Sequence, residues 1–321
     1  MIKFGIIGAG WRSEFYLRIA MLVPDVFSVS GIYIRNPEKR EEFKKKYNVS
    51  IFGTLDELLK TDFDFIVSCV NKDSICQTAG LLSEKGIPVL TETPVSIDGL
   101  TGKIQVAEQF HLMPRNQAYK SIIDSGLIGE VQQVQVSCCH DYHAASLIRF
   151  FLEITDQIPE KTTITLKDNL IRYNSRAGII DPTPVSSQQK ITVFNFGDKS
   201  AIYDFNFEQY FSEIRAARIV IRGSKGEIVD NKCTYLENNT VHSFEIVRNC
   251  NGSYENLNGF SLVNITCNGK VVYVNPFKDA RLSDEEIAIA TCLVKMKKYV
   301  DGGAEFYSPQ SAFKDFDMMQ V

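Results

Sequence analysis

Short apolar segments alternate with longer, polar-faced segments through the first third of this 321-residue chain. Four segments rich in β-branched residues have the length and composition of buried strands, at 3–9, 28–34, 65–70 and 88–92. The segments between them have the pattern of helices, at 14–23, 37–47, 55–60 and 74–85. This alternation predicts a parallel, doubly wound sheet with right-handed crossover connections.

The pattern changes at Pro114, which opens a predicted helix that ends near Ser125-Gly126. Beyond it, apolar and polar residues alternate with a period of two, at 131–137, 162–166, 190–196, 200–207, 218–221 and 271–274. With turn signals such as Asn251-Gly252, these stretches predict a mostly antiparallel sheet that is covered on one face. A last helix is expected at 284–299, where Ser283 and Glu286 can form a capping box. We therefore expect an α/β domain at 1–113 and an α+β domain with a large open sheet at 114–321.

The composition excludes several classes of protein. Hydrophobic residues make up 44% and charged residues 23% of the chain, as in an ordinary soluble enzyme. A net charge of −4 and a pI near 5.7 argue against nucleic acid as a partner. No apolar run approaches the roughly 18–20 residues of a membrane span, so no membrane partner is expected. The chain begins directly with a strand-like segment, which indicates a cytoplasmic protein without a signal peptide.

The cysteines do not predict a metal site. There are eight of them, with no CxxC pair and no spacing that matches a zinc ligand set. Cys138 and Cys139 are adjacent and would point to opposite faces of a strand, so they could not hold one ion together. His140 and His143 have the spacing of a metal pair, but no third ligand lies nearby in the sequence. We expect reduced thiols and no bound metal.

A glycine-rich turn links the first predicted strand to the first predicted helix. It reads Gly8-Ala9-Gly10-Trp11-Arg12-Ser13. Gly8 permits a tight turn, and Gly10 leaves room for a pyrophosphate at the helix N-terminus, where free N–H groups attract an anion. At the first turn of a strand–helix–strand unit, this motif predicts a dinucleotide site. A glycine turn without a ligand is the alternative.

The end of the second predicted strand bears on which dinucleotide is bound. A site that prefers NAD places an acidic residue there to bind the ribose hydroxyls, but this chain reads Tyr-Ile-Arg-Asn-Pro at 33–37. Arg35 can pair with a 2′-phosphate and stack on adenine, which favours NADP(H) over NAD(H) as cofactor. An exposed arginine that leads into a helix is the alternative.

Several segments spread along the whole chain together resemble one family of enzymes. They read GIIGAGWRSEF, RNPEK, KGIPVLTETP, DSGLIGEVQQVQV, HAASLIRFFL, GSKGEIV, RLSDEEIAIA and FYSPQSAFKDF. The chain resembles the glucose-fructose oxidoreductase and inositol dehydrogenase family (Gfo/Idh/MocA). The resemblance implies a Rossmann dinucleotide-binding domain and a C-terminal α+β domain, with a homodimer or homotetramer formed through the open sheet. It also implies NAD(P)-dependent oxidation of a hydroxyl, or reduction of a carbonyl, on a small sugar-like or polyol-like substrate between the domains.

The chain departs from the family pattern at positions that carry chemistry. Thr93 stands where the family's Glu-Lys-Pro motif has lysine. A family histidine in the helix after the fourth strand falls at Ile75, and the family's His-x-x-Asp becomes His143 with Ser146 in place of the aspartate. The segment 95–103 also looks too short for the helix that family members commonly have there.

His143 is the best candidate to manage the proton of the reaction, because histidine titrates near neutral pH. Thr93 could donate a hydrogen bond to a substrate carbonyl, and Tyr142 or His140 could supply the proton instead. A histidine of the core or of an interface is the alternative. Arg176 and Asp181 fit either a substrate pocket or a surface turn. The candidate cofactor contacts are Gly8, Gly10, Trp11, Arg12, Arg35, Val70, Asn71 and Glu92.

Three functions fit this sequence. The first is an NAD(P)-dependent oxidoreductase with an atypical site. The second is a dinucleotide-binding regulatory or interaction protein that has lost catalysis, because losing one positioned acid or base group costs about 10²–10⁴ in rate. The third is a ligand-binding module that binds no nucleotide.

Overall fold

The computed structural model describes residues 1–252 and 259–320. The chain forms two compact units. Unit 1 contains Met1–Pro114, Asn249–Asn264 and Asn275–Asp317, and unit 2 contains Arg115–Arg248, Ile265–Val274 and the last residues from Met318. The chain first passes from unit 1 to unit 2 after Pro114, and it returns to unit 1 at Asn249 and again at Asn275.

Unit 1 contains the predicted parallel sheet. Its six strands have the order β3-β2-β1-β4-β5-β6, and every neighbouring pair is parallel. The strands are β1 (Ile2–Ile7), β2 (Phe27–Tyr33), β3 (Ile51–Phe52), β4 (Phe65–Ser68), β5 (Val89–Thr91) and β6 (Ile104–Val106). The helices between them are α1 (Trp11–Leu22), α2 (Pro37–Lys46), α3 (Leu55–Leu58) and α4 (Ile75–Glu84). The predicted doubly wound fold is confirmed, and residues 92–103 contain no helix, as expected for the short segment there.

Helices cover both faces of this sheet. On one face, the ring of Phe4 in β1 contacts Tyr16 of α1 edge-on and stacks on Phe65 of β4. On the opposite face, Ile7 of β1 packs in a cluster with Leu58 of α3 and with residues of α4. Because successive residues of a strand point to opposite faces, the apolar run of β1 is buried on both sides.

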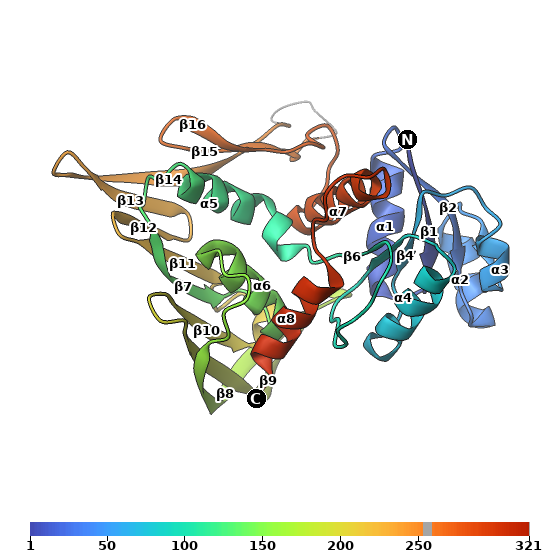
Figure 1. Ribbon diagram of the computed structural model, residues 1–321, viewed down its shortest axis with the longest axis horizontal. Helices are drawn as coiled ribbons and strands as arrows, with labels where there is room; N and C mark the ends of the chain where they lie inside the picture. Colours follow the sequence, from blue (N-terminus) through green and yellow to red (C-terminus); the bar gives the residue numbers. More distant parts are fainter. Residues whose placement is uncertain (253–258, 321) are drawn as a thin grey trace. The chain divides into compact units, whose positions relative to one another are not determined.

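A helix from the far end of the sequence completes unit 1. Helix α7 (Asp284–Val300) packs against α1 (Figure 1). Ser283 and Glu286 form the predicted capping box at its start. Glu286 also accepts a hydrogen bond from Arg18 Nε of α1 at 2.5 Å, and the ring of Phe277 lies 5.8 Å from that of Phe27 in β2. These contacts join α7 to unit 1.

The second sheet has ten strands in the order β16-β15-β14-β13-β12-β11-β7-β10-β9-β8. Its strands are β7 (Val131–Ser137), β8 (Glu160–Ser175), β9 (Gly178–Asn195), β10 (Ser200–Asn206), β11 (Arg218–Gly223), β12 (Gly226–Val229), β13 (Lys232–Glu237), β14 (Thr240–Cys250), β15 (Leu262–Cys267) and β16 (Lys270–Val274). In the described part of the sheet, β7 and β10 pair in parallel and six other pairs run antiparallel. The predicted mostly antiparallel sheet is confirmed.

Helices α5 (Pro114–Asp124) and α6 (Asp141–Leu152) lie between the strands of unit 2 in the sequence. Helix α6 packs on β7, whose inward residues Val134 and Val136 are fully buried. Asn251 and Gly252 follow the end of β14, and the predicted turn runs into residues 253–258, which lie outside the described part. None of the helices in the described residues is long and apolar enough to cross a membrane.

Candidate functional site

The turn after β1 has the geometry that the glycine motif requires. Gly8 has a φ of +110°, and a Cβ placed there would lie 2.5 Å from the carbonyl oxygen of Cys69. Gly10 is the N-cap of α1, and no side chain caps this helix end. A Cβ at Gly10 would meet no atom within 4 Å, so the space beside the first turn of α1 is open. Free N–H groups facing open space at a helix N-terminus suit a phosphate group.

Arg12 and Glu92, two of the predicted cofactor contacts, bind each other. Arg12 Nε lies 3.1 Å from Glu92 Oε2, and Arg12 Nη1 lies 2.8 Å from Glu285 Oε1. Tyr16 donates a hydrogen bond of 2.6 Å to Glu92 Oε1, and Gln109 Nε2 donates one of 3.1 Å to Glu285 Oε1. These side chains form a polar network next to the glycine turn. The network holds the guanidinium of Arg12 in place through its two carboxylate partners.

Burial changes the protonation of the carboxyl groups near this network. It raises the pKa of Glu92, although the charge of Arg12 and the hydrogen bond from Tyr16 act in the opposite direction. Burial also raises the pKa of Glu108, which follows β6, to about 8. The Phe110 N–H donates to Glu108 Oε1 at 3.0 Å and only partly offsets this effect. The carboxyl group of Glu108 is therefore mostly neutral near pH 7.

Two arginines lie at the end of β2, where the sequence predicted one. Arg35 is exposed, and its guanidinium forms no hydrogen bond or ion pair with the described residues. Arg40 of α2 donates from Nη1 to the carbonyl oxygen of Ile34 at 3.2 Å, so its guanidinium lies beside the end of the strand. The sequence argument missed Arg40 because it considered only the residues directly after the strand.

The carboxyl ends of β4 and β5 carry buried hydroxyl groups. Ser68 and Thr91 are register partners, and the side-chain oxygens of both are buried without a hydrogen-bond partner in the described residues. Val70 is half-buried and Asn71 is exposed after β4. Thr93 is half-buried after β5 and precedes a cis peptide bond to Pro94. Val70 and Asn71, the predicted cofactor contacts, and Thr93, the predicted substrate contact, thus follow two neighbouring strands of the sheet.

His143 lies on the first turns of α6, in a group of aromatic residues of unit 2. It is buried, with 5% of its surface exposed, and its ring lies 4.5 Å from that of Tyr142 and 5.0 Å from that of His140. Ser146, one turn further along α6, has a buried hydroxyl without a hydrogen-bond partner in the described residues. His143, the predicted proton carrier, therefore lies one helical turn from the Ser146 hydroxyl, which has no hydrogen-bond partner in the described residues.

Two tyrosines that the sequence argument missed hold the start of α6. Tyr210 Oη lies 2.9 Å from both the backbone nitrogen and the ring Nδ1 of His140. Tyr203 Oη accepts a hydrogen bond from the Asp141 N–H at 3.1 Å. Burial and the neighbouring His143 lower the pKa of His140 to about 4, so this ring is neutral at pH 7 and a weak base. Both tyrosines are more than sixty residues away in the sequence, and no local pattern marks them.

The expectation that Cys138 and Cys139 point to opposite faces of a strand is wrong. Strand β7 ends at Ser137, before either cysteine, and the two Sγ atoms lie 3.8 Å apart. The chain bends after the strand, so the alternation of a strand no longer applies. The described residues contain no group of three or more His, Cys, Asp or Glu side chains that could hold a metal ion.

Arg176 and Asp181 lie on the long hairpin of β8 and β9. Arg176 is in the two-residue turn between the strands, Asp181 is in β9, and both are exposed. The hairpin is longer than the predicted stretches at 162–166 and 190–196, because its polar and proline-containing part also pairs as strands. The surface-turn interpretation fits Arg176 better than a pocket.

Comparison with known proteins relates this site to a family. Residues 2–116 match the model of an oxidoreductase family with an NAD-binding Rossmann fold, GFO_IDH_MocA. The chain is 32% identical over 96 residues to scyllo-inositol 2-dehydrogenase (NADP(+)) IolU of Bacillus subtilis, a match that covers 29% of each chain. It is 21% identical over 254 residues to L-aspartate dehydrogenase of Methanococcus maripaludis, which covers 74% of this chain and 88% of that protein.

A solved structure has a similar fold along nearly the whole chain. It is levoglucosan dehydrogenase in complex with NADH and levoglucosan, with a TM-score of 0.66 and 13% sequence identity. The similarity covers 99% of this chain and 96% of that one. At this level of identity, it shows a shared fold and not a shared substrate.

Proposed function

The chain belongs to the Gfo/Idh/MocA oxidoreductase family, and from this premise we propose that it is an NAD(P)-dependent oxidoreductase with an atypical site. It transfers a hydride between nicotinamide and a hydroxyl or carbonyl group of a small sugar-like or polyol-like substrate. The observation that carries this proposal is the uncapped, open N-terminus of α1 behind Gly8 and Gly10.

The residues of unit 1 fit a dinucleotide. The first turn of α1 offers N–H groups to the pyrophosphate, and Trp11 begins this helix beside it. The unpartnered hydroxyls of Ser68 and Thr91 lie at the sheet edge where Val70, Asn71 and Thr93 follow the strands. When bound, the nicotinamide supplies the hydride chemistry, and the protein has to orient it and manage one proton. Glu92 contributes indirectly, because it holds Arg12 behind the glycine turn.

Replacing Gly10 with alanine tests the nucleotide site. The new methyl group meets no protein atom, so the melting temperature should stay nearly unchanged. It would occupy the space for the pyrophosphate, and we expect the Kd for NADPH and NADH to rise about tenfold or more. The fluorescence of Trp11, the single tryptophan, reports binding. Gly80→Ala in α4 is the matched control, because its Cβ would make only an ordinary contact, 3.9 Å from Leu100 Cδ2. Unchanged affinity in Gly10→Ala, or no binding to the wild type, would contradict the proposal.

NADP(H) is the proposed cofactor, supported by Arg35 and Arg40 at the end of β2. Arg35→Ala should raise the Kd for NADPH about tenfold, since a hydrogen bond to a charged group contributes about 1.5–3 kcal/mol. The Kd for NADH should stay within about twofold of its wild-type value, because NADH carries no 2′-phosphate. Lys45→Ala, which removes an exposed cation from the last turn of α2, serves as the control. Equal losses for both dinucleotides in Arg35→Ala would show that Arg35 does not bind the phosphate.

We propose His143 as the group that exchanges the substrate proton, supported by its place beside the unpartnered hydroxyl of Ser146. His140 is less suited to this role, because its pKa of about 4 makes it a weak base at neutral pH. Thr93 remains the candidate that donates a hydrogen bond to the substrate carbonyl.

The second candidate function is a dinucleotide-binding regulatory or interaction protein without catalysis. It is favoured by Ile75, which is 1% exposed where the family pattern has histidine, and by Thr93 in place of lysine. Turnover assays with NADPH and NADH would separate the two functions. The substrates should include scyllo-inositol, levoglucosan and L-aspartate, with their oxidised counterparts, because the relatives act on or bind these classes. Dinucleotide binding without turnover across such a panel would favour the regulatory function.

A further inference from the structure

A polar pocket of about 390 Å³ lies in unit 2, where residues of β7, β9, β10 and the segment leading into β11 meet. It is lined by Ser137, Gln189, Asp204, Gln209, Arg215, Ala216 and Arg218. Six of these seven side chains carry a polar or charged group, and none of them belongs to the candidate catalytic or cofactor residues. Its volume is within the range of small-molecule sites, at the lower end.

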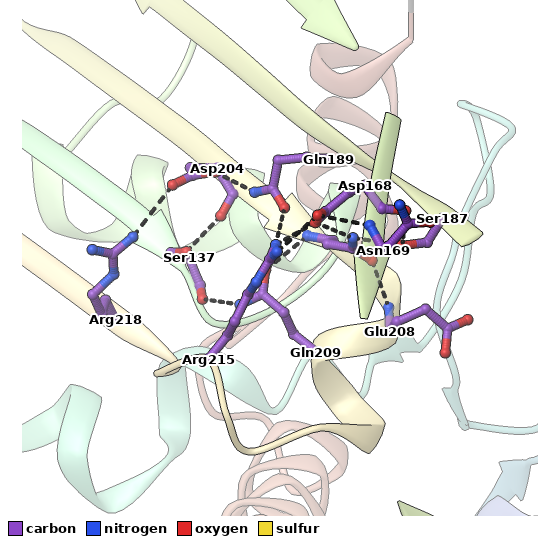
Figure 2. Close-up of polar contacts among 11 residues, drawn as sticks. Ser137, Asp168, Asn169, Ser187, Gln189, Asp204, Glu208, Gln209, Arg215 and Arg218 are labelled. Carbon is purple, nitrogen blue, oxygen red and sulfur yellow. Dashed lines mark hydrogen bonds and ion pairs between the residues drawn. The ribbon is translucent and has the colours of Figure 1, made fainter. Parts of the chain in front are cut away.

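One wall of the pocket is held rigidly. Both Nη atoms of Arg215 contact the carboxylate of Asp168, with Nη2 at 2.8 Å from Oδ1, and Figure 2 shows the two groups facing each other. Asn206 Nδ2 also donates to Asp168 Oδ2 at 2.8 Å, and Gln189 Oε1 accepts from Arg215 Nη1 at 3.2 Å. The hydrogen bond from Arg215 holds the pKa of Asp168 below its ordinary value. This bidentate ion pair fixes the plane of the Arg215 guanidinium in the absence of a ligand.

Arg218, another residue of the pocket lining, has charged N–H groups that form no hydrogen bond with the described residues. Arg218 contacts only Asp204 among the described residues, through Nη2 at 3.4 Å from Oδ2 (Figure 2). Its Nε–H and Nη1–H groups remain available, and its side chain is 51% exposed. Asp204 is itself held by Gln189, whose Nε2 donates to Oδ1. The pocket therefore offers a cationic donor beside fixed carboxylate and amide acceptors.

We propose that this pocket is a second ligand site, which binds a small carboxylate that carries several hydroxyl groups. Asp204 accepts one of the two Nη2 hydrogens of Arg218, so the other Nη2–H and the N–H parallel to it form a free edge. This edge matches a carboxylate, which prefers two parallel N–H donors. Asp204, Gln189 and Gln209 provide acceptors and donors for neighbouring hydroxyl groups. The site is independent of the proposed function, because it needs neither a dinucleotide nor His143.

The pocket adjoins the residues that hold the start of α6. The 3-10 helix η3 (Phe207–Phe211) contributes Gln209 to the pocket, and its next residue, Tyr210, bonds to His140. A ligand in the pocket therefore contacts the same short helix that positions His140, within unit 2.

Calorimetric titration of the full chain with D-gluconate tests the site. We expect one binding event per chain and a Kd about tenfold or more higher in Arg218→Ala, since charge-assisted bonds to the carboxylate are lost. Arg218→Lys keeps the positive charge but lacks the two parallel N–H donors of a guanidinium, and it should give an intermediate Kd. Acetate, which has no hydroxyl groups, and myo-inositol, which has no carboxylate, should each bind about tenfold more weakly than gluconate.

Arg222→Ala is the matched control. Arg222 is on the same strand and the same face as Arg218, is similarly exposed, and pairs with Glu227 and Gln133 outside the pocket. Its removal should leave gluconate binding unchanged, and so should His143→Gln. The proposal fails if the wild type does not bind gluconate, if Arg218→Ala binds it normally, or if Arg222→Ala or His143→Gln loses binding equally. Melting temperatures of all variants verify that they are folded. NADPH is titrated separately, so that a lack of dinucleotide binding, which contradicts the proposed function, is distinguished from a lack of gluconate binding.

Discussion

Replacing His143 with glutamine is expected to lower kcat by about 10²–10⁴-fold, the usual cost of losing a positioned acid or base. Glutamine has a similar volume and can form hydrogen bonds, but it cannot exchange a proton near neutral pH. His143 is buried on α6, so the near-isosteric change is preferable to alanine, which would leave a cavity. The loss should appear in kcat with any substrate that the wild type turns over, while the Kd for NADPH should stay unchanged.

A second histidine of unit 2 provides the control for this experiment. His242 lies in β14 and stacks on Tyr235, away from α6 in the sheet order. His242→Gln should therefore retain wild-type kcat. Full activity in His143→Gln, with an unchanged melting temperature, would remove His143 from the proton step. A loss of activity that accompanies unfolding would instead make it a core histidine.

Glu108→Gln is expected to change how the free energy of unfolding depends on pH. Burial raises the pKa of Glu108 to about 8 in the folded protein, against about 4.3 in an unfolded chain. Between these values the folded state binds more protons than the unfolded state, so the wild type loses stability as the pH rises. At about 1.4 kcal/mol for each pKa unit, the total loss is on the order of 5 kcal/mol.

Glutamine stays neutral across this range and keeps the Oε1 atom that accepts from the Phe110 N–H at 3.0 Å. We therefore expect the free energy of unfolding of the variant to match that of the wild type near pH 4 and to exceed it by about 5 kcal/mol above pH 8. Denaturant unfolding at several pH values measures the difference. Glu84→Gln, at an exposed position at the end of α4, should leave the profile unchanged. Parallel profiles for the wild type and Glu108→Gln would mean that Glu108 is ionised in the folded protein.

Periodicity in the sequence was sufficient to predict most of the fold. The alternation of apolar runs and polar-faced segments predicted the parallel sheet of unit 1, because buried strands and amphipathic helices have different periods. The change to a period of two after Pro114 predicted the second, mostly antiparallel sheet for the same reason. The glycine turn was also predictable, because glycine is the residue that most readily adopts a positive φ and tolerates a close backbone contact. Gly8 has both features, with a φ of +110° and a position beside the Cys69 carbonyl. The homo-oligomer and the domain boundary at 113 stay predictions.

Contacts between distant residues could not be predicted in this way. Arg12 as a cofactor contact stays a prediction, but no local pattern indicated that Glu92, which follows β5, and Glu285 of α7 bind its guanidinium. Cys138 and Cys139 were expected on opposite faces, but the chain leaves β7 one residue earlier.

The sequence by itself determined which segments form strands and helices, and where a helix begins directly after a glycine turn. These features depend on neighbours within a few residues, whose spacing can be read from the sequence. Only the tertiary structure brought Tyr210 to His140, and Arg215 and Arg218 to the pocket with Asp168 and Asp204. Those partners are 14 to 70 residues apart in the sequence, so their meeting depends on the strand order and register of the second sheet.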